Sequence, residues 1–146
     1  MYANHYENNL EAEVMSAAPL RLVQMLYRGA LDATTSARAY LQAGEIAERS
    51  RQITKVQAIL AELSVSLDHA RGGIIADRLS GLYAYMQRRL AEANSRQADE
   101  PLAETERLLR ILTEAWEECS PEPESHQFQF AIPAPPCEYR SYNVVG

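Results

Sequence analysis

The histidines are the first side chains to consider for chemistry, because imidazole binds metals and carries protons near neutral pH. His5, His69 and His126 lie far apart in the 146-residue chain. None of them has a Glu or Cys neighbour at a spacing that would converge on a metal ion. The sequence therefore predicts no metal site and no cofactor.

The acidic side chains form no pattern that suits acid–base catalysis. Glu62 and Asp68 are not at a spacing that aligns them on one helical face. A longer acidic series has the pattern of a solvated helix face: Glu104, Glu106, Glu114, Glu117 and Glu118. Gly72-Gly73 lacks the flanking residues of a phosphate-binding loop and indicates a turn. We expect no catalytic residue, and therefore not an enzyme.

The elements around these residues are four amphipathic helices between Ser16 and Trp116, with apolar side chains three and four residues apart. Their apolar stripes are Val23, Leu26, Ala30, Ala33, Ala37 and Tyr40; Ile53, Val56, Leu60, Leu63 and Leu67; Ile75, Leu79, Leu82, Met86, Leu90 and Ala93, with Tyr83 and Tyr85 to either side; and Leu102, Leu108, Leu109, Ile111, Leu112, Ala115 and Trp116. Small residues in the first stripe allow a neighbouring helix or a ligand to approach closely.

Helix-breaking residues separate the four stretches. Gly44, then Gly72-Gly73, then Asp99 and Pro101 stand where one periodic segment stops and the next begins. Short connections favour antiparallel neighbours, so the predicted fold is all-α, an antiparallel up-and-down four-helix bundle over residues 16–119. Ser16 suits the N-cap of the first helix, with Pro19 in its first turn.

Two segments flank the predicted bundle. The N-terminal arm, residues 1–15, carries an apolar side chain every fourth residue: Tyr2, Tyr6, Leu10 and Val14. This arm either completes the core or forms a strap over a binding groove. The tail, residues 120–146, is rich in Pro, Glu, Ser and Gln and is predicted to be flexible. Phe128, Phe130 and Ile132 alternate within it, so a short piece of the tail has the pattern of a docking segment.

Composition excludes several classes of protein. A hydrophobic content of 47% in 146 residues is enough for the core of one domain. The formal net charge of −6 argues against nucleic acid as the main partner, because phosphate binding needs clustered Lys and Arg. Without an apolar run of about 18 residues or a signal peptide, we predict a cytoplasmic protein with no membrane insertion.

The ordered motifs of the chain resemble the flagellar secretion chaperone FliS family. The first motif is Ala18–Tyr27 followed by Gly29-Ala30-Leu31. The second comprises Leu63, Ser66-Leu67-Asp68, Gly72-Gly73, Ile75-Ala76, Leu79, Leu82-Tyr83, Tyr85-Met86, Arg89-Leu90 and Ala93-Asn94. The last comprises Leu108-Leu109, Leu112 and Ala115-Trp116. The resemblance covers residues 1–118 in collinear order.

The resemblance implies a cytoplasmic, non-catalytic export chaperone. Its client would be the disordered C-terminal segment of flagellin, which forms helices around the bundle and is kept from polymerising early. Its second partner would be the flagellar type III secretion apparatus. A client that folds on binding must offset its ordering cost, so it needs a large apolar surface.

The resemblance also implies a set of client-binding residues. They lie in the arm, the first helix and the third helix: Tyr6, Leu10, Leu22, Met25, Leu26, Tyr27, Leu79, Leu82, Tyr83 and Met86. Leu26, Leu79, Leu82 and Met86 sit on apolar stripes and also suit packing, whereas Tyr27 and Tyr83 lie off the stripe centres and favour a groove. Asn94 suits a cap at the end of the third helix.

Two features depart from the family pattern. Arg28 stands where the family more often has an acidic residue, and the tail after Trp116 is longer and richer in proline. Two other classes of function stay open on sequence grounds. One is a helical ligand-binding or enzymatic bundle, which would need polar groups on facing stripes. The other is a structural homo-oligomer, which would self-associate through the same apolar faces.

Overall fold

The computed structural model describes residues 20–119. These residues form four helices and no strand: α2 Leu20–Ala43, α3 Ile46–Val65, α4 His69–Arg96 and α5 Asp99–Glu117. The predicted all-α fold is confirmed. The predicted helix start at Ser16, the arm 1–15 and the tail 120–146 lie outside the described residues.

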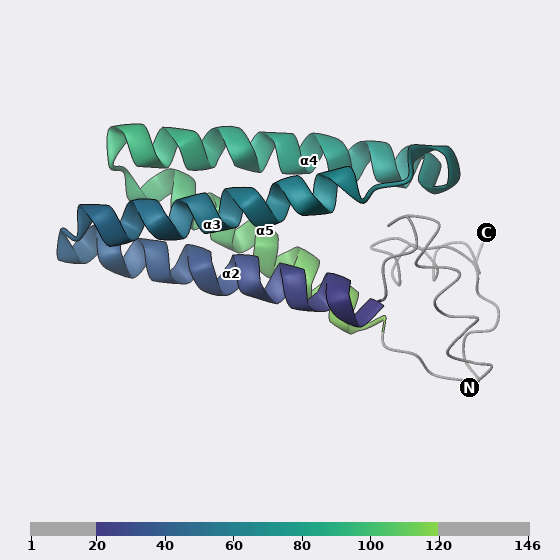
Figure 1. Ribbon diagram of the computed structural model, residues 1–146, viewed down its shortest axis with the longest axis horizontal. Helices are drawn as coiled ribbons and strands as arrows, with labels where there is room; N and C mark the ends of the chain where they lie inside the picture. The colour runs from purple at the N-terminus through teal and green to yellow at the C-terminus, as the bar shows by residue number, and fades with distance from the viewer. Residues whose placement is uncertain (1–19, 120–146) are drawn as a thin grey trace.

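The helices form an antiparallel bundle in which α2, α3 and α4 lie side by side and α5 runs behind them (Figure 1). Both α2 and α4 pack against α3 and α5. Arg38, late in α2, pairs with Asp99 at the start of α5, whereas Arg28, early in α2, pairs with Glu117 at the end of α5. The predicted up-and-down topology is therefore confirmed.

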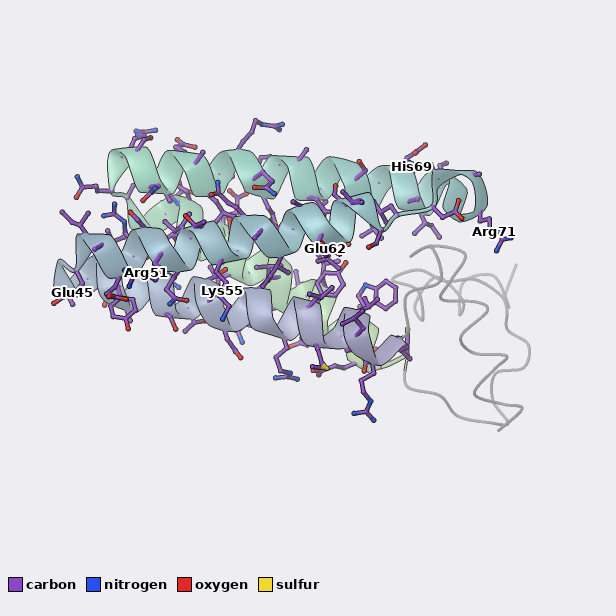
Figure 2. All side chains as sticks on the ribbon, viewed as in Figure 1. Glu45, Arg51, Lys55, Glu62, His69 and Arg71 are labelled. Carbon is purple, nitrogen blue, oxygen red and sulfur yellow. The ribbon has the colours of Figure 1, made fainter. Side chains whose placement is uncertain are left out.

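The core follows the predicted stripes, most completely on α3. All five residues of the predicted stripe are buried, four of them on α3 and Leu67 just beyond its end: Ile53, Val56, Leu60, Leu63 and Leu67. The opposite face of α3 is exposed, and Lys55 and Glu62 point outward from it (Figure 2). This two-faced pattern is what an amphipathic helix needs in order to bury one side in the core and leave the other in water.

Helices α2 and α3 share the most extensive contact in the bundle. Ala30, Ala33 and Ala37 of α2 are buried, and a Cβ added at Gly29 would lie 3.6 Å from Ile59 Cδ1 on α3. Short side chains let two helix backbones approach closely. The sequence left open whether a neighbouring helix or a ligand lies against these small residues. In the structure the neighbouring helix α3 lies there, and no ligand is needed to explain them.

The buried stripe of α2 differs from the prediction at two places. Tyr27 is completely buried, whereas Leu26 and Tyr40 are only half-buried. The three-and-four spacing runs through Val23, Tyr27 and Ala30 as well as through Leu26, so the sequence pattern alone does not choose between the adjacent positions.

The break between α3 and α4 falls earlier than predicted. Asp68 is the N-cap of α4, and its carboxylate accepts a hydrogen bond from the backbone N–H of Arg71 at 3.0 Å. Gly73 lies inside α4 and kinks it, with a φ of 56° and a ψ of −132°. The Asp side chain starts the helix four residues before the glycine pair, because it satisfies an N–H group that has no partner within the helix.

The end of α4 also corrects a prediction. The helix continues to Arg96 and closes on Gln97, which has a left-handed backbone with a φ of 52°. Asn94 is therefore inside the helix and does not cap it. Its side-chain oxygen instead accepts hydrogen bonds from Arg49 Nη2 at 3.0 Å and Ser50 Oγ at 2.9 Å, which joins the end of α4 to the start of α3.

Candidate functional site

Three aromatic side chains meet in the middle of the bundle. The hydroxyl groups of Tyr27 on α2 and Tyr83 on α4 hydrogen-bond to each other. The indole of Trp116 on α5 stacks on Tyr27 with ring centroids 5.9 Å apart and an angle of 24° between the planes. All three side chains are buried. The prediction that Tyr27 and Tyr83 lie to the side of the core is therefore wrong.

Burial sets the chemistry of the two tyrosines. Desolvation is the main cause that raises the pKa of Tyr27 well above its ordinary value, and the neighbouring Tyr83 adds to it. Burial likewise raises the pKa of Tyr83. Both phenols stay neutral at physiological pH, because ionisation would leave a charge in an apolar interior. They hold the core together and are not poised to donate or accept protons in a reaction.

Charged groups connect α2 to α5. The Arg38 guanidinium binds Asp99 through two hydrogen bonds of 2.8 Å each and Glu106 through one of 2.6 Å. Its hydrogen bond holds the pKa of Asp99 below its usual value. At Glu106 burial opposes ionisation, but hydrogen bonds from Arg38 and Thr35 outweigh it and lower the pKa. Arg28, the predicted family departure, pairs with Glu117.

A second group of charges connects α4 to α5. Arg89 binds Glu92, Glu100 and Glu104 at 2.5 to 2.7 Å. The Tyr85 hydroxyl also donates to Glu104 at 2.8 Å, and this bond is the largest cause of the lowered pKa of Glu104. The prediction of a merely solvated face is thus wrong for Glu104, Glu106 and Glu117, since each joins α5 to another helix.

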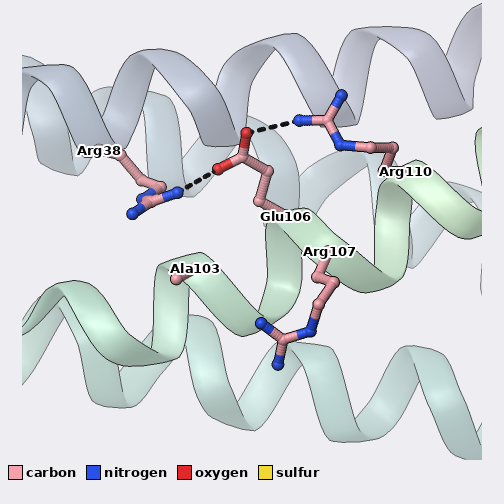
Figure 3. A pocket seen from close by; sticks show the side chains of 5 residues that line it. All are labelled: Arg38, Ala103, Glu106, Arg107 and Arg110. Atoms are coloured by element: carbon pink, nitrogen blue, oxygen red, sulfur yellow. Dashed lines mark hydrogen bonds and ion pairs between the residues drawn. The ribbon is translucent and has the colours of Figure 1, made fainter.

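A shallow pocket of about 250 Å³ opens on α5 and is lined by Arg38, Ala103, Glu106, Arg107 and Arg110. Glu106 lies between the guanidinium groups of Arg38 and Arg110, while Arg107 points away from them (Figure 3). The carboxylate that would act as a base is already shared by two arginines. The pocket is therefore a charged cleft between ion pairs rather than a reaction site.

The predicted client-binding residues of α2 separate into two groups. Leu22 and Met25 are 46% and 62% exposed, and Leu26 is half-buried against the core. Leu22, Met25 and Leu26 lie within one and a half turns of each other, and a Cβ added at Gly29, about one turn further, would lie in contact distance of Ile59 of α3. We name these three residues the α2 patch. Tyr27, by contrast, faces the core.

The predicted residues of α4 are mostly packing residues. Met86 and Tyr83 are buried in the core, and Leu79 is 8% exposed. Only Leu82 is half-buried at the surface. The structure thus leaves four of the eight described residues in reach of a partner on the intact bundle: Leu22, Met25, Leu26 and Leu82. Tyr6 and Leu10 lie outside the described residues.

A further apolar surface lies where α4 meets α5, and of its four residues only Leu82 was among the predicted site residues. Arg89–Glu100 and Tyr85–Glu104 set the antiparallel register of these helices. Steps of three and four residues continue the same faces into apolar positions: Ile75 and Leu82 on α4, and Leu108 and Ile111 on α5. Ile111 is 58% exposed, and the other three are packed at the edge of the core. We name these four residues the α4–α5 seam.

The sequence contained a signal for this seam. The fourth stripe is a wide apolar arc, because Leu108 and Ile111 lie to one side of the buried line Leu102, Leu109 and Leu112. A helix in contact with two neighbours needs a wide arc, so the arc alone did not distinguish packing from an open surface. The register that the ion pairs set was needed for that.

Two kinds of site find no support in the part of the chain that the structure describes. No three His, Cys, Asp or Glu side chains within residues 20–119 are grouped as metal ligands would be. None of the four helices is long and apolar enough to cross a membrane.

Comparison with known proteins gives the same picture throughout. The family model described as "Flagellar protein FliS" matches residues 2–123. The flagellar secretion chaperone FliS of Salmonella typhimurium is 40% identical over 114 residues, which are 77% of this chain and 84% of that protein. The flagellar secretion chaperone FliSB of Pseudomonas aeruginosa is 37% identical over 109 residues, which are 75% of this chain and 86% of that protein.

The flagellar secretion chaperone FliS of Escherichia coli is 36% identical over 110 residues, 75% of this chain and 81% of that protein. The family match spans all four helices of the bundle, including the α2 patch and the α4–α5 seam. It therefore rests on the whole folded unit and not on one motif. The chain belongs to the FliS family of flagellar secretion chaperones.

Proposed function

We propose that this protein is a cytoplasmic, non-enzymatic chaperone that binds the disordered C-terminal segment of flagellin. It keeps flagellin from polymerising early and aids its delivery to the flagellar type III secretion apparatus. The α2 patch is the observation that carries the proposal, since it exposes large apolar side chains on a helix within the family match. Exposed apolar groups are typical of surfaces that bind other proteins.

The α2 patch suits a client that folds on binding. Leu22, Met25 and Leu26 present a row of apolar groups along a helix, which fits helix-in-groove recognition. Met25 is an unbranched, flexible side chain and adapts to different apolar partners. Leu82 extends the proposed contact surface on the α4 side. Tyr6 and Leu10 of the arm remain proposed contacts.

The buried members of the predicted site have an indirect role in this proposal. Tyr27, Leu79, Tyr83 and Met86 pack in the core, and a client on the intact bundle would not touch them. They support the helices that carry the contact residues. Substitutions of these four residues would change client binding only through the stability of the fold.

Calorimetric titration with the C-terminal segment of flagellin from the same organism tests the proposal. We expect saturable one-to-one binding with a large negative heat-capacity change, because folding on an apolar surface buries much apolar area. No binding by the intact protein, and none by a variant without residues 1–14, would contradict the proposal and favour the self-associating or ligand-binding alternatives.

The contact surface is tested by polar substitution of its exposed residues. The double variant Leu22→Gln, Met25→Gln should bind the flagellin segment at least about tenfold more weakly, since each buried Leu or Met contributes about 1.5–3 kcal/mol and tenfold is about 1.4 kcal/mol. The matched control is Ile46→Gln at the start of α3, where the isoleucine is 55% exposed. Equal weakening by both variants would exclude the α2 patch as the binding surface.

A further inference from the structure

The α4–α5 seam changes character halfway along its length. One half is covered by the polar network of Arg89, Tyr85, Glu100 and Glu104. The other half consists of Ile75, Leu82, Leu108 and Ile111, and Ile111 is 58% exposed. Ile75, Leu82 and Leu108 are only partly buried at the edge of the core, so an occupant that covered them together with Ile111 would remove apolar area from water.

Two arginines border this apolar half without a bound carboxylate. Arg78 of α4 and Arg107 of α5 are exposed and form no ion pair with another residue of 20–119. Arg107 points away from Glu106 toward the α4 side of α5 (Figure 3). Arg110, the other arginine of α5, pairs with Glu106, as does Arg38 of α2. The seam therefore suits an occupant that is apolar and carries negative charge.

A segment of this chain has that chemistry. Phe128, Phe130 and Ile132 alternate, so in an extended conformation their side chains point to one side. Pro133 favours an extended backbone at Ile132 and opposes a helix. Glu122 and Glu124 precede the three apolar residues and supply negative charge.

The segment also starts in reach of the seam. Cys119 is the second residue after the end of α5, and Ile111 lies about two turns before it, about 12 Å along the helix axis at 1.5 Å per residue. Phe128 is nine positions after Cys119, and an extended chain covers about 30 Å over nine residue steps. The connection is therefore long enough to turn back along α5 with slack.

We propose that the segment Phe128–Ile132 docks on the α4–α5 seam of its own chain, with Arg78 and Arg107 attracting Glu122 and Glu124. The arm is a less suitable occupant, because it leads into α2 and the α2 patch is the apolar surface that is nearest to it along the chain. Tail docking does not depend on flagellin: it would hold if the protein had another client, and flagellin binding would hold if the tail did not dock.

Methyl NMR of the full chain at low concentration tests the contact. Substituting Phe128, Phe130 and Ile132 together by Ala should shift the methyl resonances of Ile75, Leu82, Leu108 and Ile111, because aromatic rings shift nearby methyl groups. The methyl resonances of Ile46 and Val65, which are exposed elsewhere, should stay in place. The matched control Tyr6→Ala, Leu10→Ala should leave the seam resonances unchanged.

A second measurement starts from the seam. Ile111→Gln should speed hydrogen exchange of the amides at residues 128–132 at least about fivefold, whereas Ile46→Gln should not, because docking protects amides in proportion to the docked population. Unchanged seam resonances in the tail variant would overturn the proposal. Equal shifts from the arm variant would assign the seam to the arm, and shifts that vary with protein concentration would assign it to a second copy of the chain.

Discussion

The hydrogen bond between Tyr27 and Tyr83 is the main polar contact within the core. It joins α2 to α4, two helices that pack mainly on α3 and α5 rather than on each other. Each hydroxyl has the other as a hydrogen-bond partner, and both side chains are almost inaccessible to water. Buried polar groups cost little when paired and much when one partner is removed.

Single removal of either hydroxyl should therefore be worse than removal of both. We expect Tyr27→Phe or Tyr83→Phe to lower the free energy of unfolding by about 1–3 kcal/mol, because the remaining hydroxyl is left unpaired. The double variant should recover part of that loss. Urea unfolding followed by fluorescence of Trp116, the single tryptophan, measures all three. Additive losses would mean that the two hydroxyls do not depend on each other.

At the residue scale the sequence predicts apolar burial well and polar burial poorly. Ile53, Val56 and Leu60 are buried as their spacing predicts. Tyr27 satisfies the same spacing, but a phenol suits a surface as readily as a core. The sequence therefore did not show whether Tyr27 faces the core or the solvent. The partner that decides it, Tyr83, is 56 residues away in the chain. Contacts of that kind are absent from local patterns.

The start of helix α5 was predicted correctly, whereas the role of its acidic residues was not. Asp99 and Pro101 correctly mark its start, although the N-cap is Ala98 and Asp99 binds Arg38 instead of capping. The acidic residues looked solvated because the sequence does not show which helix faces them. Three of them pair with arginines of α2 or α4, so they stabilise the position of α5.

These carboxylates make stability depend on pH. The pKa values of Asp99, Glu104 and Glu106 are lowered in the folded protein, so the unfolded chain binds more protons as the pH falls. Their stabilisation is present above the ordinary carboxyl pKa, about 4, and is lost as pH falls through the folded values. Urea midpoints should fall steadily from about pH 5 to pH 3. Arg38→Met should flatten this dependence, and an equally steep profile in that variant would contradict the assignment.

Two glycines of α4 allow the same substitution to be compared at a strained and at a helical backbone position. Gly73→Ala should destabilise the protein by about 1–3 kcal/mol, because its φ of 56° and ψ of −132° are strained for a residue with a Cβ. Gly81→Ala should stabilise it by about 0.5–1 kcal/mol, because this helical glycine has nothing within 4 Å of an added Cβ. Thermal unfolding compares the two. Loss of stability at both sites would show that steric room for the added Cβ, rather than backbone conformation, determines the effect of the substitution.

At the scale of the molecule the sequence predicts the architecture and only part of the surface. Stripe spacing and short breaks suffice for four antiparallel helices, because each helix must bury one face. Leu22 and Met25, two of the predicted contact residues, are exposed, whereas Leu82 was the only residue of the α4–α5 seam that was predicted. The exposure of the seam depends on the register between two helices, which Arg89 and Tyr85 set across the interface.

The arm offers a prediction on the same scale. Its apolar residues, Tyr2, Tyr6, Leu10 and Val14, need a surface, and the α2 patch is the nearest along the chain. Deleting residues 1–14 should raise the affinity for flagellin or promote self-association, because a covered surface is freed. Titration, dye binding and sedimentation test this. A truncated protein that stays monomeric, binds no more dye and binds flagellin unchanged would show that the arm is no strap.

The stacking of Trp116 on Tyr27 has a consequence for synthesis on the ribosome. The α2–α3 hairpin closes through local contacts across Gly44, and such contacts form fast. The aromatic centre, however, joins residues 89 positions apart in the chain, so it closes only after the last helix has been made. Until then the nascent chain exposes the side of Tyr27 that Trp116 will cover. The core of this chaperone is therefore incomplete for most of its own translation, and during that time the nascent chain is prone to aggregation.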